Sequence, residues 1–267
     1  MKVKSETYNT TRELLLATPL PEQTRTYKPI PYRQVMDLTL EGIHKAGFSL
    51  EKEIYTSAKD GAVATGRYTI GNVGDTEMKL QINWMNSYDK SKRLTFAIGG
   101  VVLVCTNGMV GFRSLNAFKK KHQGEIQTFT PTMIPEYIKQ AGEVFLGLQA
   151  DREAMKEISV TQRLTAEILG RLFYEEQILE STQLNIVKRE LEHPTHNYNS
   201  PGTLWELFNH VTFAIGGIHP ASWLDDHVTA HRFFTNIADV IDTEYAEISF
   251  PATEDKRQLK LFPEVFA

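Results

Sequence analysis

The sequence predicts an α+β protein built on a mainly antiparallel sheet of four or five strands, with one helix before the sheet and a helical half after it. Between residues 48 and 106, short apolar stretches alternate with polar positions and end at turns rich in Gly, Asn and Asp, as antiparallel strands do. Beyond residue 130, apolar residues recur at three- and four-residue spacing, which is typical of amphipathic helices. The fold class therefore follows from a change of period near the middle of the chain.

Three regions follow from this change of period. Residues 1–31 are expected to form an N-terminal arm, because four prolines punctuate a polar segment there. Residues 32–130 are expected to hold the sheet core, and residues 131–267 a helical region packed on that core. If the protein oligomerises, the arm could cross to a neighbouring copy.

The first elements of the core are recognisable from their periods. Apolar residues at helical spacing predict a helix over residues 32–46, and Gly47 provides its stop. The dipeptide Asp60-Gly61 is a strong signal for a hairpin turn between strands. The strands expected around it are Phe48 to Tyr55, Ala64 to Ile70 and Met78 to Trp84, of which the last alternates most cleanly between apolar and polar residues.

Residues 83–113, NWMNSYDKSKRLTFAIGGVVLVCTNGMVGFR, are expected to form a hairpin and the centre of the sheet. The polar piece NSYDKSKR predicts a turn, and Leu94 to Ile98 alternates as the next strand. Gly99-Gly100 interrupts that strand, which indicates either a bulge or a close approach of another part of the chain. Cys105 ends the apolar run and is interpreted as a packed thiol rather than a nucleophile.

The helical half is expected to begin near Ile134, with Pro135 in a first turn. Ser181 or Thr182 is a candidate cap for a short helix that Pro194 ends. The helices expected are Ile134 to Leu148, Leu164 to about Leu179, the short helix from residue 181, residues 203–217 and residues 225–242, with a small strand from Tyr245 to Phe250.

Composition excludes several classes of protein. No run of about 18 apolar residues exists, so no membrane helix is expected, and the N-terminus does not resemble a signal peptide. One cysteine excludes an internal disulfide, and a cytoplasmic setting is expected. The net charge is -4, yet residues 1–130 hold 18 Lys and Arg against 12 Asp and Glu, whereas residues 131–267 hold 11 against 21. This split indicates either a basic face on the first half or an uneven spread of solvated charge.

Enzymatic motifs are absent or weak. The chain has no Gly-rich phosphate loop and no Gly-x-Ser-x-Gly elbow, which disfavours the common nucleotide-dependent enzymes and hydrolases. His227 and His231 are four residues apart and would share a helix face, so they are weak candidates for a metal site. The Glu of the zinc-protease pattern is missing between them, and surface or capping roles are favoured. No metal and no cofactor are expected, and a non-enzymatic protein is favoured.

A cluster of basic residues is the stronger functional signal. Cations that follow a nucleic-acid backbone, with Phe112 and Phe118 interleaved for base stacking, are typical of a single-strand binding surface. Gln81 and Asn83 are expected to be exposed on strands beneath the cluster. The alternative is a solvated charge run with two core phenylalanines. The candidate nucleic-acid-binding residues are Lys79, Lys90, Lys92, Arg93, Arg113, Lys119, Lys120 and Lys121.

Two segments resemble a known family. NSYDKSKRLTFAIGGVVLVCTNGMV, residues 86–110, is similar to the signature of phage/plasmid-like proteins that share a domain of unknown function, DUF932. GTLWELFNHVTFAI, residues 202–215, resembles a later helix of that family, with departures at Phe208-Asn209-His210 and Gly216-Gly217. The resemblance covers about residues 30–235 and implies an origin in a mobile element, with no catalytic residue to transfer.

The order of elements is similar to that of single-strand annealing recombinases, the RecT, Erf and Red-beta superfamily. This looser resemblance implies rings or filaments that hold single-stranded DNA along a basic groove beside the strands. The favoured function is therefore a phage- or plasmid-encoded protein that binds single-stranded DNA and helps it anneal, without enzymatic activity, as a homo-oligomer in the host cytoplasm. The alternatives are a phage protein that binds and inhibits a host defence component and, third, a metal-dependent enzyme.

Overall fold

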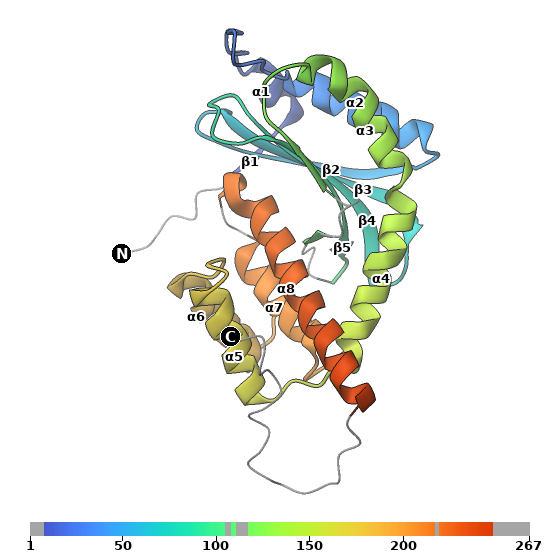
Figure 1. Ribbon diagram of the computed structural model, residues 1–267, viewed down its shortest axis with the longest axis vertical. Coiled ribbons are helices and arrows are strands. Elements are labelled where there is room, and N and C mark those ends of the chain that lie inside the picture. The colour runs from blue at the N-terminus through green and yellow to red at the C-terminus, as the bar shows by residue number, and fades with distance from the viewer. Residues whose placement is uncertain (1–7, 105–107, 111–116, 217–218, 248–267) are drawn as a thin grey trace, which may run out of the picture.

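A computed structural model of the chain describes residues 8–104, 108–110, 117–216 and 219–247, and within them seven strands form one sheet with eight helices around it (Figure 1). The strands are β1 (Asn9–Thr10), β2 (Leu50–Ala58), β3 (Val63–Gly74), β4 (Met78–Ser87), β5 (Leu94–Val102), β6 (Gly108–Val110) and β7 (Ala117–Lys120). The helices are α1 (Arg12–Ala17), α2 (Tyr32–Lys45), α3 (Ile126–Lys139), α4 (Ala141–Glu157), α5 (Gln162–Tyr174), α6 (Ser181–Glu192), α7 (Leu204–Ile215) and α8 (Pro220–Glu247).

The sheet is antiparallel throughout, in the order β1-β2-β3-β4-β5-β6, and β7 pairs with β5 next to β6. Helices α2 and α3 lie above the sheet in Figure 1, α7 and α8 lie below it, and α4 runs down one side. The predicted α+β fold class is confirmed, with the sheet lengthened by the short strands β1, β6 and β7.

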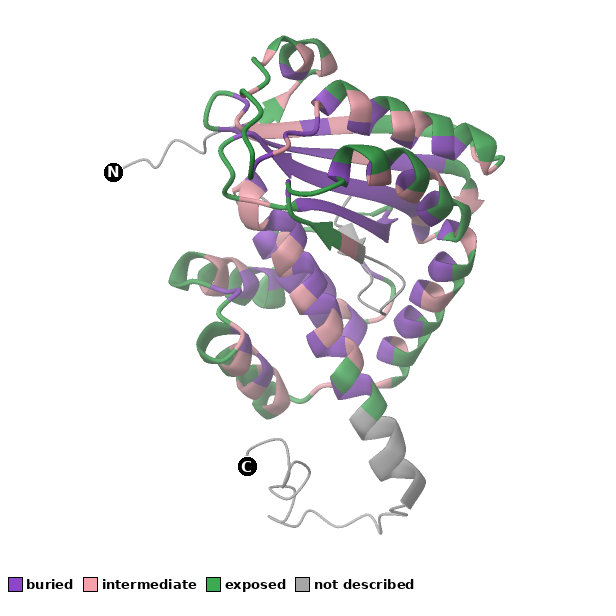
Figure 2. Cartoon of the chain, turned by 45° about the horizontal axis from the view of Figure 1, so that its top comes forward, coloured by how far each residue is buried: buried purple, intermediate pink, exposed green. Residues whose placement is uncertain are grey.

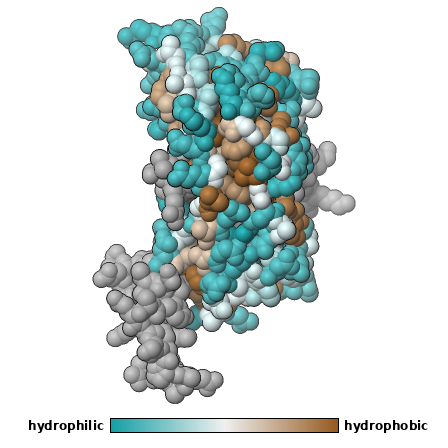
Figure 3. Space-filling view, turned by 90° about the vertical axis from the view of Figure 1, so that its right-hand side faces the viewer, coloured by the Kyte–Doolittle hydropathy of each residue, from teal (hydrophilic) through white to brown (hydrophobic). Residues whose placement is uncertain are grey.

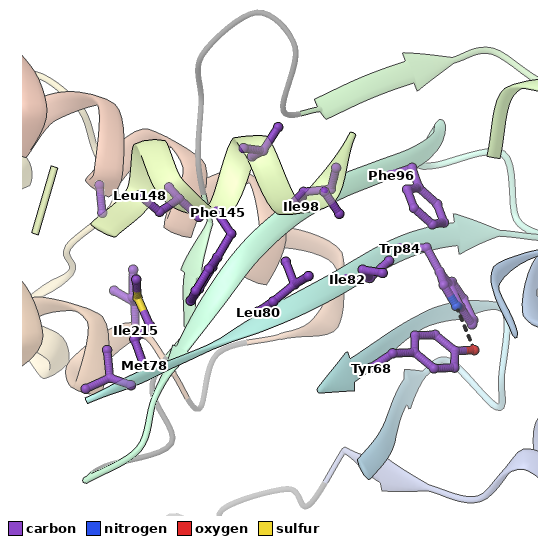
Figure 4. Packing of buried hydrophobic residues seen from close by; sticks show 14 of the residues in the cluster. Tyr68, Met78, Leu80, Ile82, Trp84, Phe96, Ile98, Phe145, Leu148 and Ile215 are labelled. Carbon is purple, nitrogen blue, oxygen red and sulfur yellow. Dashed lines mark hydrogen bonds between the residues drawn. The ribbon is translucent and has the colours of Figure 1, made fainter. Parts of the chain in front are cut away.

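One face of the sheet is apolar because β3, β4 and β5 place large side chains on it at every second position. Trp84 lies at its centre, and the indole Nε1 donates a hydrogen bond to the hydroxyl of Tyr68 at 3.2 Å (Figure 4). Phe145 and Leu148 of α4 pack on the same face beside Ile98 (Figure 4). We call this side of the sheet the apolar face.

Gly99 and Gly100 do not interrupt β5. Both pair in register with β4, opposite Gln81 and Leu80. A Cβ atom on Gly100 would lie 2.6 Å from the sulfur of Met78, so the second glycine is required by close packing rather than by a bulge.

The opposite side of the sheet, which we call the polar face, carries Arg67, Gln81 and Asn83 at its centre. At one end of this face, a small apolar cluster joins Met85 of β4 to Trp223 and its neighbours on α8. Figure 2 shows that the central strands are buried on both sides, whereas the helices keep exposed outer sides. Helix α8 therefore covers the polar face as α2, α3 and α4 cover the apolar face.

The N-terminal arm is attached to the core. Strand β1 pairs with β2, Leu15 of α1 is buried, and Tyr27 and Ile30 are buried as well. The boundary expected between residues 130 and 131 falls inside α3. The arm therefore contributes side chains to the core rather than lying apart from it.

Three details of the helical half differ from the sequence-based expectation. Pro135 lies inside α3 and not in a first turn, because α3 begins earlier at Ile126. The cap of α6 is Glu180, whose side chain forms a capping box with Gln183. Residues 245–247 continue α8 as helix, and residues 248–250 lie outside the described part of the chain.

The outward faces of the helices are mainly hydrophilic. Figure 3 views the molecule from the side along which α4 runs and shows apolar side chains scattered among hydrophilic ones. Leu146 of α4 is the most exposed aliphatic side chain among the described residues, with 67% of its surface accessible. No helix among the described residues is long and apolar enough to cross a membrane.

Candidate nucleic-acid interface

A hollow of about 360 Å³ lies beside the turn that joins β4 to β5. Four of its nine lining residues are Lys or Arg, and none is Asp or Glu. In a chain with a net charge of -4, such a lining gathers positive charge locally. The lining residues of this basic hollow are Thr26, Tyr27, Lys90, Ser91, Lys92, Arg93, Lys121, His122 and Gln123.

The turn between β4 and β5 is held by its own side chains. The Asp89 carboxylate accepts hydrogen bonds from the backbone N–H and the hydroxyl of Ser91 and pairs with Lys59 at 2.7 Å. Burial alone would raise the pKa of Asp89, but these donors lower it to about 2. Lys90 adopts a positive φ of 66°, which turns the chain back toward β5. The turn thus presents Lys90, Lys92 and Arg93 from a fixed backbone.

The inner wall of the basic hollow is a buried histidine. The ring Nε2 of His122 lies 2.6 Å from the side-chain oxygen of Asn86, and the His122 carbonyl accepts a hydrogen bond from the backbone N–H of Lys28. The Asn86 amide in turn donates to the carbonyl of Ile30. Burial lowers the pKa of His122, so the charge of the hollow comes from its Lys and Arg residues.

Tyr27 closes one side of the basic hollow. Its hydroxyl donates to the carbonyl of Tyr88 at 3.2 Å, and its ring lies under the Lys90 ammonium, which is 4.8 Å from the ring centre. The ring is 5% exposed. Tyr27 therefore orients Lys90 and offers no free face on which a base could stack.

An acidic residue of α8 lies at the edge of the basic hollow. Asp225 pairs with Lys119 at 2.5 Å and with Lys92 at 3.6 Å. Asp226 follows it, and burial together with the charge of Asp225 raises the pKa of Asp226 to about 6. Helix α8 thus neutralises part of the positive charge that the β4–β5 turn and β7 present.

The structure brings most of the predicted basic residues together. Lys90, Lys92, Arg93 and Lys121 line the basic hollow itself. Lys119 and Lys120 lie on β7, opposite Thr95 and Leu94 of β5. Lys119 pairs with Asp225, and the Lys120 ammonium lies 4.4 Å from the ring centre of Phe129.

Other predicted features lie elsewhere. Lys79 pairs with Glu51 at 2.5 Å, far along β4 from the turn. Phe118 packs in the core, stacked on Phe96 with ring centres 5.6 Å apart, and is not a stacking platform for bases. Gln81 and Asn83 were expected to be exposed, but both are buried, on the side of the sheet where Met85 packs against α8. Three predicted features, Cys105, Phe112 and Arg113, lie outside the described residues.

The two candidate metal ligands face different neighbours. Nδ1 of His227 lies 2.9 Å from the carbonyl oxygen of Trp223, whereas Nε2 of His231 lies 3.1 Å from the carboxylate of Asp151. Among the described residues, no group of three or more His, Cys, Asp or Glu side chains is placed to hold a metal ion. The histidine pair is therefore part of the packing of α8 against the sheet and against α4.

Sequence reasoning missed Tyr27, His122 and Asp225. The sequence contains no local signal for Tyr27 or Asp225, because each reaches the basic hollow from an element distant along the chain from the turn at residues 88–93. Only the run Lys119 to His122 could have suggested that His122 follows the lysines into the same site.

Comparison with protein families agrees with this architecture. A model of the domain of unknown function DUF932 matches residues 19–216. The chain belongs to the DUF932 family. The DUF932 match includes the whole basic hollow and stops after α7, so α8 with Asp225 lies beyond it. No curated protein and no solved structure matches the chain.

Proposed function

We propose that this protein binds single-stranded DNA at the basic hollow and helps complementary strands to anneal, with no enzymatic step, as a phage- or plasmid-encoded protein of the host cytoplasm. One observation carries the proposal: four Lys and Arg side chains converge around a hollow that has no Asp or Glu in its lining. Phosphate neutralisation by such residues supplies most of the affinity for nucleic acid when no base is read.

The lining favours contact with the backbone and leaves the bases free. Its two aromatic residues, Tyr27 and His122, are both buried, so neither offers a face to a base. Its remaining residues are cationic or small and polar. A strand held by its phosphates alone keeps its pairing edges open, as annealing requires.

Self-assembly would extend the hollow into a longer track. One hollow of about 360 Å³ holds only a few phosphates. Copies arranged in a ring or filament would join their hollows and add their affinities through effective concentration. Light scattering with and without oligo-dT tests this part of the proposal: a mass that stays that of one chain in both conditions contradicts it.

The binding test compares two double variants that remove the same charge. Lys90→Ala/Lys121→Ala removes two of the four Lys and Arg side chains that line the basic hollow. Lys79→Ala/Lys139→Ala removes two lysines that lie at the far end of β4 and at the end of α3. Fluorescence anisotropy with labelled oligo-dT, over a series of salt concentrations, gives the affinity and its salt slope.

We expect the first variant to weaken binding roughly tenfold and to reduce the salt slope by about 1.4, because each lost phosphate contact on a single strand removes about 0.7. The rate at which two complementary oligonucleotides form a duplex should fall in parallel. The matched control should bind and anneal as the wild type does. Wild-type protein that shows no binding at low salt, or equal losses in both variants, would refute the proposal.

A surface on α5 favours the second candidate, an interaction protein that blocks a host defence component. Phe173 and Tyr174 are adjacent and exposed, by 42% and 80%, with Glu175 and Glu176 directly after them. Exposed aromatic pairs are typical of protein contact sites. Capture of a host protein that is lost in Phe173→Ala/Tyr174→Ala, with binding of oligo-dT unchanged, would favour this function.

A further inference from the structure

A layer of buried polar side chains lies between the sheet and α8, away from the basic hollow. Arg67 of β3 stands directly opposite Asn83 of β4, and Thr69 stands opposite Gln81 in the next pair. The neighbouring positions on β5 are Ala97 and Gly99, and Ala97 packs in the apolar cluster around Trp223. The amide and guanidinium groups of the polar face therefore gather beside that cluster.

These side chains lack the partners that buried polar groups have. Arg67 Nε, Gln81 Oε1 and both polar atoms of the Asn83 amide are buried and have no hydrogen-bond partner in the structure. Buried side-chain polar atoms in proteins are nearly always bonded, so several orphans on one face need an explanation. Asn83 and Gln81 are exposed by only 0% and 4%, so bulk water does not supply the partners.

The charge of Arg67 is also uncompensated. The described residues place no carboxylate within ion-pair distance of the guanidinium, whose flat side instead lies 4.9 Å from the ring centre of Trp223. Stacking on an aromatic ring leaves the N–H edge of a guanidinium free for a planar or tetrahedral oxyanion. Burial lowers the pKa of Arg67, and no neighbouring negative charge offsets this effect.

His227 closes the inner end of the layer from α8. Its Nδ1 lies 2.9 Å from the carbonyl oxygen of Trp223, an atom that only accepts, so Nδ1 carries the proton and Nε2 has a free lone pair. Burial and the nearby charge of Arg67 lower the pKa of His227 to about 4. The imidazole is therefore neutral near pH 7 and adds an acceptor to the donors of Arg67 and Asn83.

A groove of about 760 Å³ leads from the surface to this layer. Arg67, Thr69 and Gln81 line its inner part, and the apolar side chains of Ile54, Val101 and Leu103 line the rest together with residues of β1, α1 and β2. Three carboxylates line it: Glu51 pairs with Lys79, Glu53 lies 3.9 Å from Arg12, and Glu13 is in no ion pair among the described residues. Lys52 and Arg67 are the cations of the lining that no carboxylate among the described residues engages, and of these Lys52 is exposed on the rim whereas Arg67 lies in the inner part.

We propose that this groove binds a small organic oxyanion, a carboxylate or a phosphate monoester, with its anionic head on Arg67 beside Gln81 and its apolar part against Ile54 and Val101. A groove of this volume is within the usual range for small-molecule sites. The anionic head accepts hydrogen bonds from the guanidinium of Arg67 and from the amide of Gln81, both of which line the inner part of the groove.

Three probes test the proposal by isothermal titration calorimetry on the full-length protein: inorganic phosphate, thymidine monophosphate and hexanoate. We expect at least one of them to bind with one-to-one stoichiometry. Tighter binding of hexanoate identifies a carboxylate ligand, and tighter binding of the monophosphate identifies a phosphate monoester. Absence of binding by all three at millimolar concentration overturns the proposal and leaves the layer with ordered water only.

Two variants locate the bound probe. Arg67→Met keeps an unbranched apolar stem and removes the guanidinium, and should weaken binding at least tenfold, as the loss of a charge-assisted hydrogen bond does. Asn83→Asp places a carboxylate opposite Arg67, and should raise the melting temperature of the free protein and abolish binding of the probe. Equal binding by wild type and either folded variant overturns the proposal.

The proposal is independent of single-strand binding at the basic hollow. The Lys90→Ala/Lys121→Ala variant should bind the probe as the wild type does, because the hollow lies beside the β4–β5 turn and the groove lies on the β1 side of the sheet. If Lys90→Ala/Lys121→Ala abolishes binding of the probe and Arg67→Met does not, the probe binds at the basic hollow. This result overturns the assignment to the groove.

Discussion

The two faces of the sheet are both buried, yet they carry opposite kinds of side chain. The apolar face places Trp84, Phe96 and Ile98 against α2, α3 and α4. The polar face places Arg67, Gln81 and Asn83 against α8. Successive residues of a strand point to opposite faces of the sheet, so β3, β4 and β5 supply the side chains of both faces. The two faces differ because these strands carry mainly apolar residues at one set of alternate positions and mainly polar residues at the other.

The two faces therefore have different effects on the free energy of folding. An apolar face gains free energy from every side chain that it buries, whereas unpaired amides and an uncompensated guanidinium cost free energy on burial. A protein under selection for stability alone would fill the polar face with Leu, Ile or Val. The polar face therefore points to a ligand, and the apolar face supplies the stability that tolerates its cost.

Trp84→Ala should have the largest effect, because it breaks the centre of the apolar face. The substitution removes a fully buried indole, its hydrogen bond to Tyr68 and its stacking near Tyr32. We expect the free energy of unfolding to fall by about 3–5 kcal/mol, measured by urea denaturation. Leu146→Ala, on the exposed side of α4, should change it by less than about 0.5 kcal/mol.

The second effect is a pH dependence that arises on the polar face. The pKa of His227 is about 4 in the folded protein, against about 6.5 for an unperturbed His, so the unfolded state binds the extra proton between these values. Stability from His227 is therefore fully present above about pH 6.5 and is lost as the pH falls toward 4, by about 3 kcal/mol in all.

Asp226 opposes this dependence and must be removed to see it. Its folded pKa of about 6 lies above the ordinary Asp value, so its contribution to stability is present at low pH and is lost as the pH rises through 6. In an Asp226→Asn background, stability should rise steadily between pH 4 and 6.5, measured by chemical denaturation at each pH. Adding His227→Gln should reduce this slope, although His122 and His210, whose pKa values burial also lowers, keep part of it. Adding the exposed His193→Gln should leave the slope unchanged. A profile that keeps its full slope without His227 assigns the titration to another group.

Sequence reasoning found the elements that have a strong local period. Residues 32–46 and Met78 to Trp84 were predicted almost to their ends, because helical and alternating patterns are fixed by neighbours along the chain. Strands β1, β6 and β7 are two to four residues long and show no period, so they form only because a longer strand offers its edge. The sequence marks the glycine pair of β5, and only the structure identifies Met78 as the close neighbour of its second member, Gly100.

The candidate sites were predictable to a smaller extent. Lys90, Lys92 and Arg93 could be grouped because they lie within a span of four residues at the β4–β5 turn, and Lys121 was predicted as part of a separate run of three lysines. The alternation of Gln81 and Asn83 with apolar residues showed which side of β4 they share, but not that α8 covers that side. Burial by an element about 140 residues away leaves no mark on the local pattern, so the polar face was mistaken for a solvated one.

Asn83→Leu should have a smaller effect than the pH change, and of the opposite sign to Trp84→Ala. Leu has nearly the shape of Asn, and the substitution removes two buried polar atoms that have no partner. In the absence of ligand, we expect stability to rise by about 1 kcal/mol, measured by urea denaturation in a buffer without phosphate or carboxylate. A loss of stability would mean that ordered water satisfies the Asn83 amide, and would remove the contrast between the faces at this position.

The smallest effect is expected on the affinity for single-stranded DNA, from a substitution in the part of α8 that contacts the lysines at the edge of the basic hollow. Asp225→Asn frees Lys119 and Lys92 from their carboxylate partner. Partly exposed ion pairs contribute about 0–1 kcal/mol, so the affinity for oligo-dT should rise by about two- to fivefold at low salt, measured by fluorescence anisotropy, with little change in stability. Glu51→Gln, which frees Lys79 on the far part of β4, is the matched control and should leave the affinity unchanged. A weaker affinity in Asp225→Asn would show that the carboxylate positions the two lysines for phosphate rather than competing with it, and would make α8 part of the binding surface as well as the cover of the polar face.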